Sequence, residues 1–251
     1  MFVFGSGNLW GIPLTDSAGV AIVNPTPSLF GTLQDISADL SFDTKMLHGQ
    51  NQFPVAIGRG KGKLSLKAKF ARVNGLLINT LFFGQTLNAN GIADNYDTTG
   101  AAIPTTPFQI TPTVPQSGTW TVDLGVRNAA GNQMTRVASA PATGQYSVAA
   151  GIYTFAAADT GLIVFIDYQY TFTSIIAKKS TVLNVPMGNI PTFRTEVQTS
   201  YQGKQFVLTF PQCVGSKLAF ATKLDDFMIP EFDIEAFADA SGNVVTYSTA
   251  E

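Results

Sequence analysis

The segment from Gly49 to Gly84 constrains the fold of this chain more than any other stretch. It reads as a strand, a glycine-rich basic turn, a long second strand and then a helix. In the second strand, apolar and polar residues alternate strictly: Leu64, Leu66, Ala68 and Phe70 against Lys63, Ser65, Lys67 and Lys69. A period of two over eight residues predicts a β-strand with one buried face and one charged face.

The expected turn is GRGKGK, from Gly58 to Lys63. It does not fit a phosphate-binding loop, because Leu64 stands where Ser or Thr would hold magnesium. The sequence therefore predicts a hairpin turn here, in a long hairpin that orders on assembly, and no nucleotide site.

A helix is expected to follow the second strand. The side-chain oxygen of Asn74 can accept an otherwise unpaired backbone N–H of the first turn, and Gly84 is a natural stop. Between them lies a wide apolar stripe made by Leu76, Leu77, Thr80, Leu81 and Phe83. Such a stripe predicts one amphipathic helix packed on a chain that is otherwise mainly β.

Alternation elsewhere predicts further strands, and Leu33–Phe42 is expected to be half-buried. Trp120, Val122, Leu124 and Val126 are expected to share one buried face of another strand. The remaining predicted strands are Val20–Val23, Gln145–Val148, Ile152–Phe155, Val164–Phe172, Ser180–Val185, Phe193–Ser200, Gln205–Phe210 and Val244–Tyr247.

A change of composition divides the chain. Residues 85–175 hold only seven charged side chains in 91 positions, and Thr, Ala, Gly and Pro dominate there. Short strands at nearly regular spacing predict a small β-sandwich or barrel of its own. We therefore expect residues 85–175 to form a β module inserted into a host domain of residues 1–84 and 176–251.

Charge and cysteine content exclude several classes of protein. Only 13% of the 251 residues are charged, against roughly 25% in soluble domains, which favours extensive subunit contacts. A net charge of −2 argues against a general nucleic-acid binder. Cys213 is the single cysteine, expected to be buried on a strand, so no disulfide framework is possible within the chain.

No export or anchoring segment is recognised. The start of the chain, Met1 to Gly5, is too short for a signal-peptide core, and the apolar run Leu162–Ile166 ends at Asp167. A spanning helix needs about 20 apolar residues. We expect synthesis and first folding in a cytoplasm, and no membrane partner.

Catalytic, cofactor and metal chemistry find little support. His48 is the only histidine, no G-x-S-x-G elbow exists, and a three-histidine zinc site is impossible. Asp94 and Asp97 could ligate calcium, but the glycine and distal Glu of an EF-hand are missing, so a polar loop is favoured. Adjacent Asp225 and Asp226 would point to opposite faces of a strand. No enzyme activity is expected.

The charges are distributed unevenly. Six of the fifteen Lys and Arg residues lie in Arg59–Arg72, and six of the seventeen acids lie in Asp225–Asp239. This asymmetry predicts that basic residues of one copy meet acids of a neighbouring copy; the alternative is a solvated strand face. The predicted contact residues are Arg59, Lys61, Lys63, Lys67, Lys69, Asp225, Asp226, Glu231, Asp233 and Glu235.

Three segments resemble bacteriophage major tail tube proteins: GTLQDISADLSFDTK through LLINTLFFG, PTFRTEVQTSYQGKQFVLTFPQC, and LDDFMIPEFDIEAFADASGNVVTYS. The resemblance covers Gly31–Gly84 and Thr181–Ser248, roughly half of the chain. It implies a β-sandwich or barrel with one flanking α-helix, a fold to which the tube protein of type VI secretion is similar. The residues between these segments are extra relative to many tube proteins.

The resemblance also implies a function and a set of partners. Hexameric rings would stack into the tail tube of a virion, assembled in the host cytoplasm, through which DNA passes without sequence recognition. The implied partners are further copies of the chain, the tape measure protein, the tail terminator and distal tail proteins. Two alternatives stay open: a tail terminator or completion ring, and a capsid-decoration or adhesin-like β protein.

Overall fold

The computed structural model describes residues 5–72 and 74–250. The expectation of no export signal rests on Met1 to Gly5, and Met1 to Phe4 lie outside the described residues. Strands make up 51% of the structure and helical segments 6%, so the protein is mainly β, as the sequence predicts. The chain folds as two compact units: unit 1, Met1–Leu87 with Ser180–Glu251, and unit 2, Asn88–Lys179.

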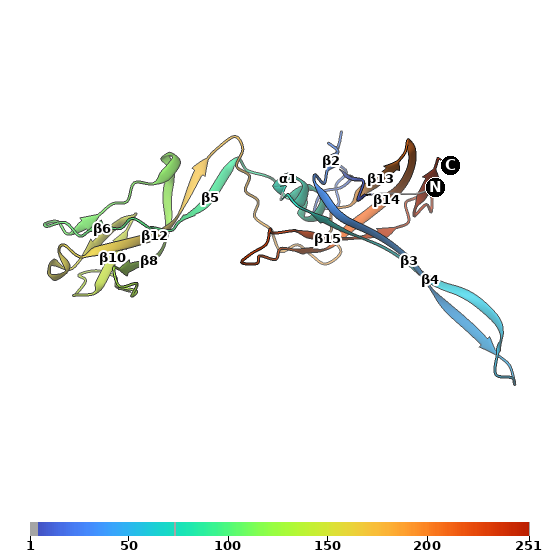
Figure 1. Ribbon diagram of the computed structural model, residues 1–251, viewed down its shortest axis with the longest axis horizontal. Coiled ribbons are helices and arrows are strands. Elements are labelled where there is room, and N and C mark those ends of the chain that lie inside the picture. Colours follow the sequence, from blue (N-terminus) through green and yellow to red (C-terminus); the bar gives the residue numbers. More distant parts are fainter. Residues whose placement is uncertain (1–4, 73, 251) are drawn as a thin grey trace. The chain divides into compact units, whose positions relative to one another are not determined.

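Unit 1 is built on one eight-stranded antiparallel sheet (Figure 1). The strand order is β2-β1-β13-β14-β15-β4-β3, and β16 pairs with β14 beyond the end of β15. The strands are β1 (Asn8–Pro13), β2 (Ser28–Leu29), β3 (Leu33–His48), β4 (Pro54–Phe70), β13 (Phe193–Tyr201), β14 (Lys204–Ala219), β15 (Glu231–Phe237) and β16 (Thr246–Thr249).

The core of unit 1 lies on the apolar face predicted for β4. Leu64, Leu66, Ala68 and Phe70 are all buried, which confirms the alternation. They pack with Phe232 and Ile234 of β15 and with Phe210 of β14. Cys213 of β14 is also fully buried, as predicted. Burying one large apolar side chain contributes about 1.5–3 kcal/mol, so this shared face fixes the β4–β15–β14 register.

The predicted helix is present but changes type halfway. The N–H groups of Leu76 and Leu77 donate to Oδ1 of Asn74, so Asn74 caps α1 (Gly75–Ile78). A π-helical turn, η1 (Asn79–Phe83), follows and ends at Gly84 with φ of 60°. Leu77 and Leu81 are fully buried. Leu76 is 45% exposed, so the predicted stripe was too wide at its first residue.

Two predicted strands are wrong. The segment Val20–Val23 contributes only an isolated bridge between Thr15 and Ala21, and Ser180–Val185 forms no strand. Each is a short apolar run, but Val20, Val23 and Leu183 are largely exposed. A short apolar run does not form a strand where no neighbouring strand pairs with it.

The hairpin of β3 and β4 extends well beyond the sheet (Figure 1). β15 pairs with β4 only from Leu64 to Lys69, so residues 41–63, here called the arm, pair only with each other and approach the rest of unit 1 only at their base, near Phe42 and Lys63. The GRGKGK segment lies inside β4, and the turn is at residues 49–53. The predicted turn is therefore wrong. The strand Leu33–Phe42 is present within β3, but only Leu33 is buried and only Ile36 half-buried, so the expected half-buried face is wrong for most of its length.

Unit 2 consists of two four-stranded sheets around one core. One sheet holds β5 (Asn90–Asn95), β6 (Ala101–Ala102), β8 (Thr119–Asn128) and β12 (Ile163–Thr173); the other holds β7 (Gln109–Ile110), β9 (Thr135–Arg136), β10 (Gln145–Ala149) and β11 (Ile152–Phe155). Tyr146 and Tyr153 of the second sheet share the core with Val126, Ile166 and Tyr168 of the first. β9 and β10 run parallel, and the other strand pairs of the described residues are antiparallel.

Two register shifts in β8 overturn its predicted pattern. They occur opposite Asp167/Tyr168 and Gln169/Tyr170 of β12. Each shift adds a residue to β8 and reverses which side chains face inward. The consequence is that Asp123 faces the core, whereas Val122 and Leu124, predicted to be buried, are about half exposed.

Candidate subunit-contact surfaces

The structure brings most of the predicted basic and acidic contact residues together within one chain. Across the β15–β4 ladder, Glu231 lies opposite Lys69 and Asp233 opposite Lys67. The Nζ atom of Lys63 is 3.3 Å from Oε1 of Glu235. Opposite charges on neighbouring strands contribute roughly 0.2–1 kcal/mol per pair. Within unit 1, therefore, Lys63 and Glu235 form an ion pair and Glu231 forms one with Lys217 of β14, at 3.4 Å. Lys67, Lys69 and Asp233 face opposite charge only through the strand register.

Four predicted contact residues are not matched in this way. Arg59 lies on the arm, with its guanidinium 4.3 Å from the centre of the Phe42 ring. Lys61 and Asp225 form no ion pair within the described part of the chain. Asp226 lies 3.9 Å from Lys223. Contact between copies stays a prediction for all ten residues. Among these four, Arg59, Lys61 and Asp225 have no ion pair within the described part of the chain.

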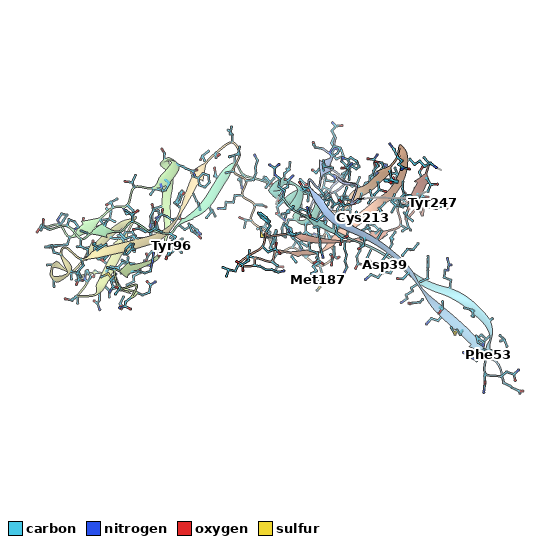
Figure 2. All side chains as sticks on the ribbon, in the orientation of Figure 1. Asp39, Phe53, Tyr96, Met187, Cys213 and Tyr247 are labelled. Atoms are coloured by element: carbon cyan, nitrogen blue, oxygen red, sulfur yellow. The ribbon has the colours of Figure 1, made fainter. Side chains whose placement is uncertain are left out.

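The arm presents many apolar side chains to solvent. Phe53, at its far end, is 81% exposed (Figure 2). The others are Phe42, Met46, Leu47, Val55 and Ile57. Large contiguous exposed apolar patches on a soluble protein mark interaction sites. These residues were not predicted as a contact surface, because the glycines from Gly58 onwards favoured a turn there; the apolar run Phe53–Ile57 is the signal in the sequence that points to them.

A β-bulge in the arm decides which side chains share a face. Phe42 pairs with Gly62 and Thr44 pairs with Arg59, so β4 has one extra residue at Gly60–Lys61. The bulge brings Arg59 onto the face that carries Phe42, which accounts for their stacking. A Cβ at position 62 would lie 2.9 Å from the Phe42 ring, so glycine lets the ring lie across the strand.

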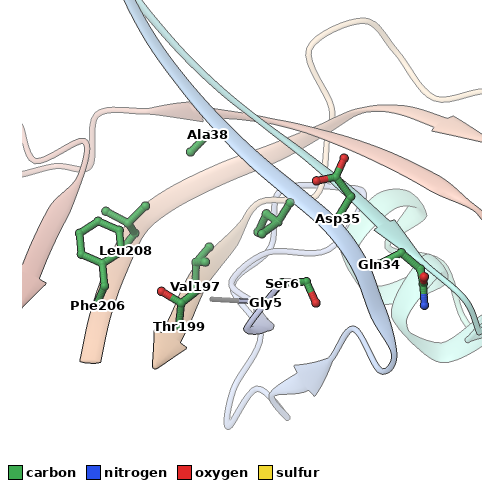
Figure 3. A pocket seen from close by; sticks show the side chains of 10 residues that line it. Gly5, Ser6, Gln34, Asp35, Ala38, Val197, Thr199, Phe206 and Leu208 are labelled. Atoms are coloured by element: carbon green, nitrogen blue, oxygen red, sulfur yellow. The ribbon is translucent and has the colours of Figure 1, made fainter. Parts of the chain in front are cut away.

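Two hollows flank the free edge strand β3. A groove of about 740 Å³ lies between Ile36 and Ala38 of β3 and Val197, Phe206 and Leu208 of β13 and β14 (Figure 3). β3 and β14 are separated in the sheet order by β15 and β4, so the sheet curves until these faces oppose each other. Apolar side chains dominate the groove, and its edge carries Gly5, Ser6, Gln34 and Asp35.

The second hollow, here called the base hollow, lies where the arm leaves the sheet. Its volume is about 470 Å³. Leu40, Phe42 and Leu64 line it from the hairpin, and Phe237 and Val245 line it from the C-terminal part. Phe42 and Phe237 are each about two-fifths exposed. The base hollow is therefore an apolar surface that unit 1 itself does not cover.

A third exposed feature is the connection between β14 and β15, residues 220–230. Leu224 is 96% exposed and Phe227 is 88% exposed. Asp225 and Asp226 stand between them, and the carboxylate of Asp226 accepts a hydrogen bond from the N–H of Phe227. Its tip, here called the acidic loop (residues 223–229), thus combines two apolar side chains with two carboxylates.

In unit 2 the inward-facing Asp123 is the centre of a polar network. Its carboxylate accepts hydrogen bonds from the hydroxyls of Tyr146, at 2.7 Å, and Tyr153, at 3.2 Å. The Nε1 atom of Trp120 donates to the Tyr153 hydroxyl, and Arg136 lies 3.7 Å from Asp123. Burial, together with the adjacent Asp123 carboxylate, raises the pKa of Tyr146. The network joins the two sheets of unit 2.

Asp94 and Asp97, the possible calcium ligands, accept hydrogen bonds from other groups of unit 2. Both oxygens of Asp97 accept backbone hydrogen bonds, from Thr99, Gly100 and Ile166. Burial alone would raise the pKa of Asp97, but these N–H groups lower it. The side chain of Asp94 accepts a hydrogen bond from Gln169. These bonds describe a polar loop, the alternative to a calcium site at Asp94 and Asp97.

The described residues contain no group of three or more His, Cys, Asp or Glu side chains placed to hold a metal ion. Among the same residues, no helix has the length and apolar character needed to cross a membrane. His48 lies exposed at the end of β3. A comparison with known proteins finds no matching family model and no curated protein of significantly similar sequence.

Proposed function

We propose that this protein is a structural virion protein that assembles into stacked hexameric rings and forms the tube of a bacteriophage tail. Support comes from the sequence resemblance of unit 1 to tail tube proteins and from its surfaces. In this reading, unit 1 is the tube-forming β-sandwich or barrel with its flanking helix. DNA passes through the lumen, and the tape measure, terminator and distal tail proteins meet the tube.

The arm is the observation that carries the proposal. The arm holds six large apolar side chains that are partly or largely exposed to solvent, and each contributes about 1.5–3 kcal/mol when fully buried. β3 is also an edge strand of 16 residues with an unpaired side. Open edges and exposed apolar arms invite pairing with another chain. A protein that assembles with itself covers both features at once.

Unit 2 fits this function as a module on the outside of the tube. A tube wall is constrained on its lumen, lateral and axial faces, so the outer surface accepts additional residues most easily. The core of unit 2 contains no residue of unit 1. Its contribution would be stiffening of the tail or weak contact with surface glycans.

Electron microscopy of the purified protein at increasing concentration tests the proposal. Open-ended tubes support it; isolated rings indicate a tail terminator, and dispersed particles indicate a decoration or adhesin-like protein. A matched variant has Asn-Gly in place of residues 43–61, which closes the hairpin between the paired Phe42 and Gly62 with a two-residue turn. It should keep the circular dichroism of the sheet and lose the tubes. If this variant forms tubes, the arm is not needed for assembly and does not support the proposal.

A further inference from the structure

We propose that the acidic loop of one copy docks in the base hollow of a second copy. The inference rests on the proposed self-assembly and names one of its contacts. It assigns the acidic loop as the partner of the base hollow, an apolar surface with a basic side chain at its rim.

The base hollow fits a small apolar element. Its volume of about 470 Å³ falls within the roughly 300–1,000 Å³ of protein binding pockets. The lining is apolar apart from Lys63 and includes Leu40, Phe42, Phe237, Val244 and Val245. Within unit 1 these side chains remain partly or largely exposed.

The acidic loop has the complementary composition. Leu224 and Phe227 project almost fully into solvent, and an isolated bridge between Lys223 and Asp226 holds the turn that presents them. An exposed aromatic and a leucine side by side at the tip of a loop are suitable anchors for an apolar hollow.

Charge favours the same pairing. The acids Glu231, Asp233 and Glu235 lie beside the basic residues of β4 in their own chain. At the rim of the base hollow, the guanidinium of Arg59 stacks on Phe42, which belongs to the lining. Arg59 has no acid paired with it in the described part of the chain, and Asp225 has no base. Docking the acidic loop places Asp225 and Asp226 next to this rim, and complementary charges orient the contact.

The geometry requires two copies. The acidic loop precedes β15 at Glu231, and the base hollow contacts the other end of β15 at Phe237. Seven strand residues separate them by about 20 Å, so a chain cannot fill its own hollow. Each copy carries one loop and one hollow, and such a head-to-tail contact repeats to give closed rings or open filaments.

Cysteine crosslinking between full-length copies tests the contact. One preparation carries Leu224→Cys and the other Ala238→Cys, an exposed residue that lines the base hollow. Mixed and oxidised, the two should give a disulfide-linked dimer containing one chain of each kind. The control replaces Ala238→Cys with Val23→Cys, an exposed position elsewhere. Cys213 is fully buried and should not react.

Charge exchange gives an independent readout. Arg59→Glu and Asp225→Lys should each raise the concentration needed for assembly about tenfold, equivalent to about 1.4 kcal/mol, and the double variant should recover most of that loss. Assemblies that form without the crosslink would overturn this contact and leave the proposed tube standing. A crosslink in closed pairs, without rings, would support the contact and contradict the tube. Absence of both crosslink and assembly would overturn both.

Discussion

The hydroxyl of Tyr146 donates a 2.7 Å hydrogen bond to Oδ2 of Asp123, which belongs to the other sheet of unit 2. Tyr146 and Asp123 are both nearly inaccessible to solvent. The bond therefore connects two sheets at a point where water cannot replace it. Two predictions depend on this relationship.

Replacing Asp123 by Ala should destabilise unit 2 by about 1–3 kcal/mol, because the hydroxyls of Tyr146 and Tyr153 lose their acceptor inside the core. Trp120 contacts the network through Tyr153, so its fluorescence during urea unfolding reports the change in a Trp10→Phe background. Asp94→Asn, an exposed acid of the same unit, serves as the control and should leave the midpoint unchanged. Equal midpoints for Asp123→Ala and the control would contradict a structural role for the network.

Unit 2 should lose stability at alkaline pH. Burial and then the hydrogen bond and charge of Asp123 raise the pKa of Tyr146 above its ordinary value, which is about 10. A raised folded-state pKa contributes stability that is complete below the unfolded pKa and is lost as the pH rises through the folded one. Urea midpoints measured from pH 9 to 12 should therefore fall, and Tyr146→Phe should reduce the slope.

The packing of the helix on the sheet should depend on Leu77 and Leu81 and not on Leu76. Leu77→Ala and Leu81→Ala each remove a fully buried side chain and should lower the free energy of unfolding of unit 1 by about 2–5 kcal/mol. Leu76→Ala, at the exposed neighbouring position, should cost less than about 0.5 kcal/mol. Thermal unfolding of the three variants checks the order; equal melting would indicate that the helix does not pack on the sheet.

Gly84 should tolerate substitution far less than Gly203. Both have positive φ, which costs an alanine roughly 1–2 kcal/mol. A Cβ at position 84 would also lie 2.6 Å from the backbone nitrogen of Ser17, whereas position 203 has open space. We expect Gly84→Ala to destabilise unit 1 by about 1–3 kcal/mol more than Gly203→Ala. The difference in urea midpoints between these two variants measures that added cost.

Unit 1 should fold without unit 2. Joining Leu87 to Ser180 through a short Gly/Ser linker removes no residue of the unit 1 core. The shortened chain should unfold in one transition matching that of unit 1 in the full chain. If it assembles into tubes, these should have an unchanged lumen and a smaller outer diameter, measurable in electron micrographs. Failure to fold would show that residues 88–179 complete the host sheet.

Local signals in the sequence were enough for the helix cap and the β4 core face. Asn74 and Gly84 act through side chains and dihedral angles within a few residues of themselves, and alternation at Leu64–Phe70 follows directly from strand geometry. Neither depends on how distant strands pair. The mainly β class follows from the same kind of signal repeated along the chain.

The register of the strands and the ion-pair partners of the charged residues could not be predicted from the local sequence pattern. Asp123 faces inward because β8 contains two bulges, and the hydroxyls that it meets there belong to tyrosines of another sheet. The glycines of GRGKGK favoured a turn, but β4 uses them within a bulged strand. Likewise, the clustering of charges could not show that Lys63 reaches Glu235 in its own chain.

The chain enters and leaves unit 2 through one antiparallel bridge, in which Asn88 and Lys179 exchange backbone hydrogen bonds of 2.9 and 3.0 Å. The first and last residues of the unit are therefore neighbours. Unit 2 is also one uninterrupted residue range, Asn88–Lys179, so a single contiguous stretch of coding sequence specifies it. No strand of unit 2 pairs with a strand of unit 1 in the described residues, so one insertion or excision event would leave the strand pairing of unit 1 in place if unit 1 folds alone.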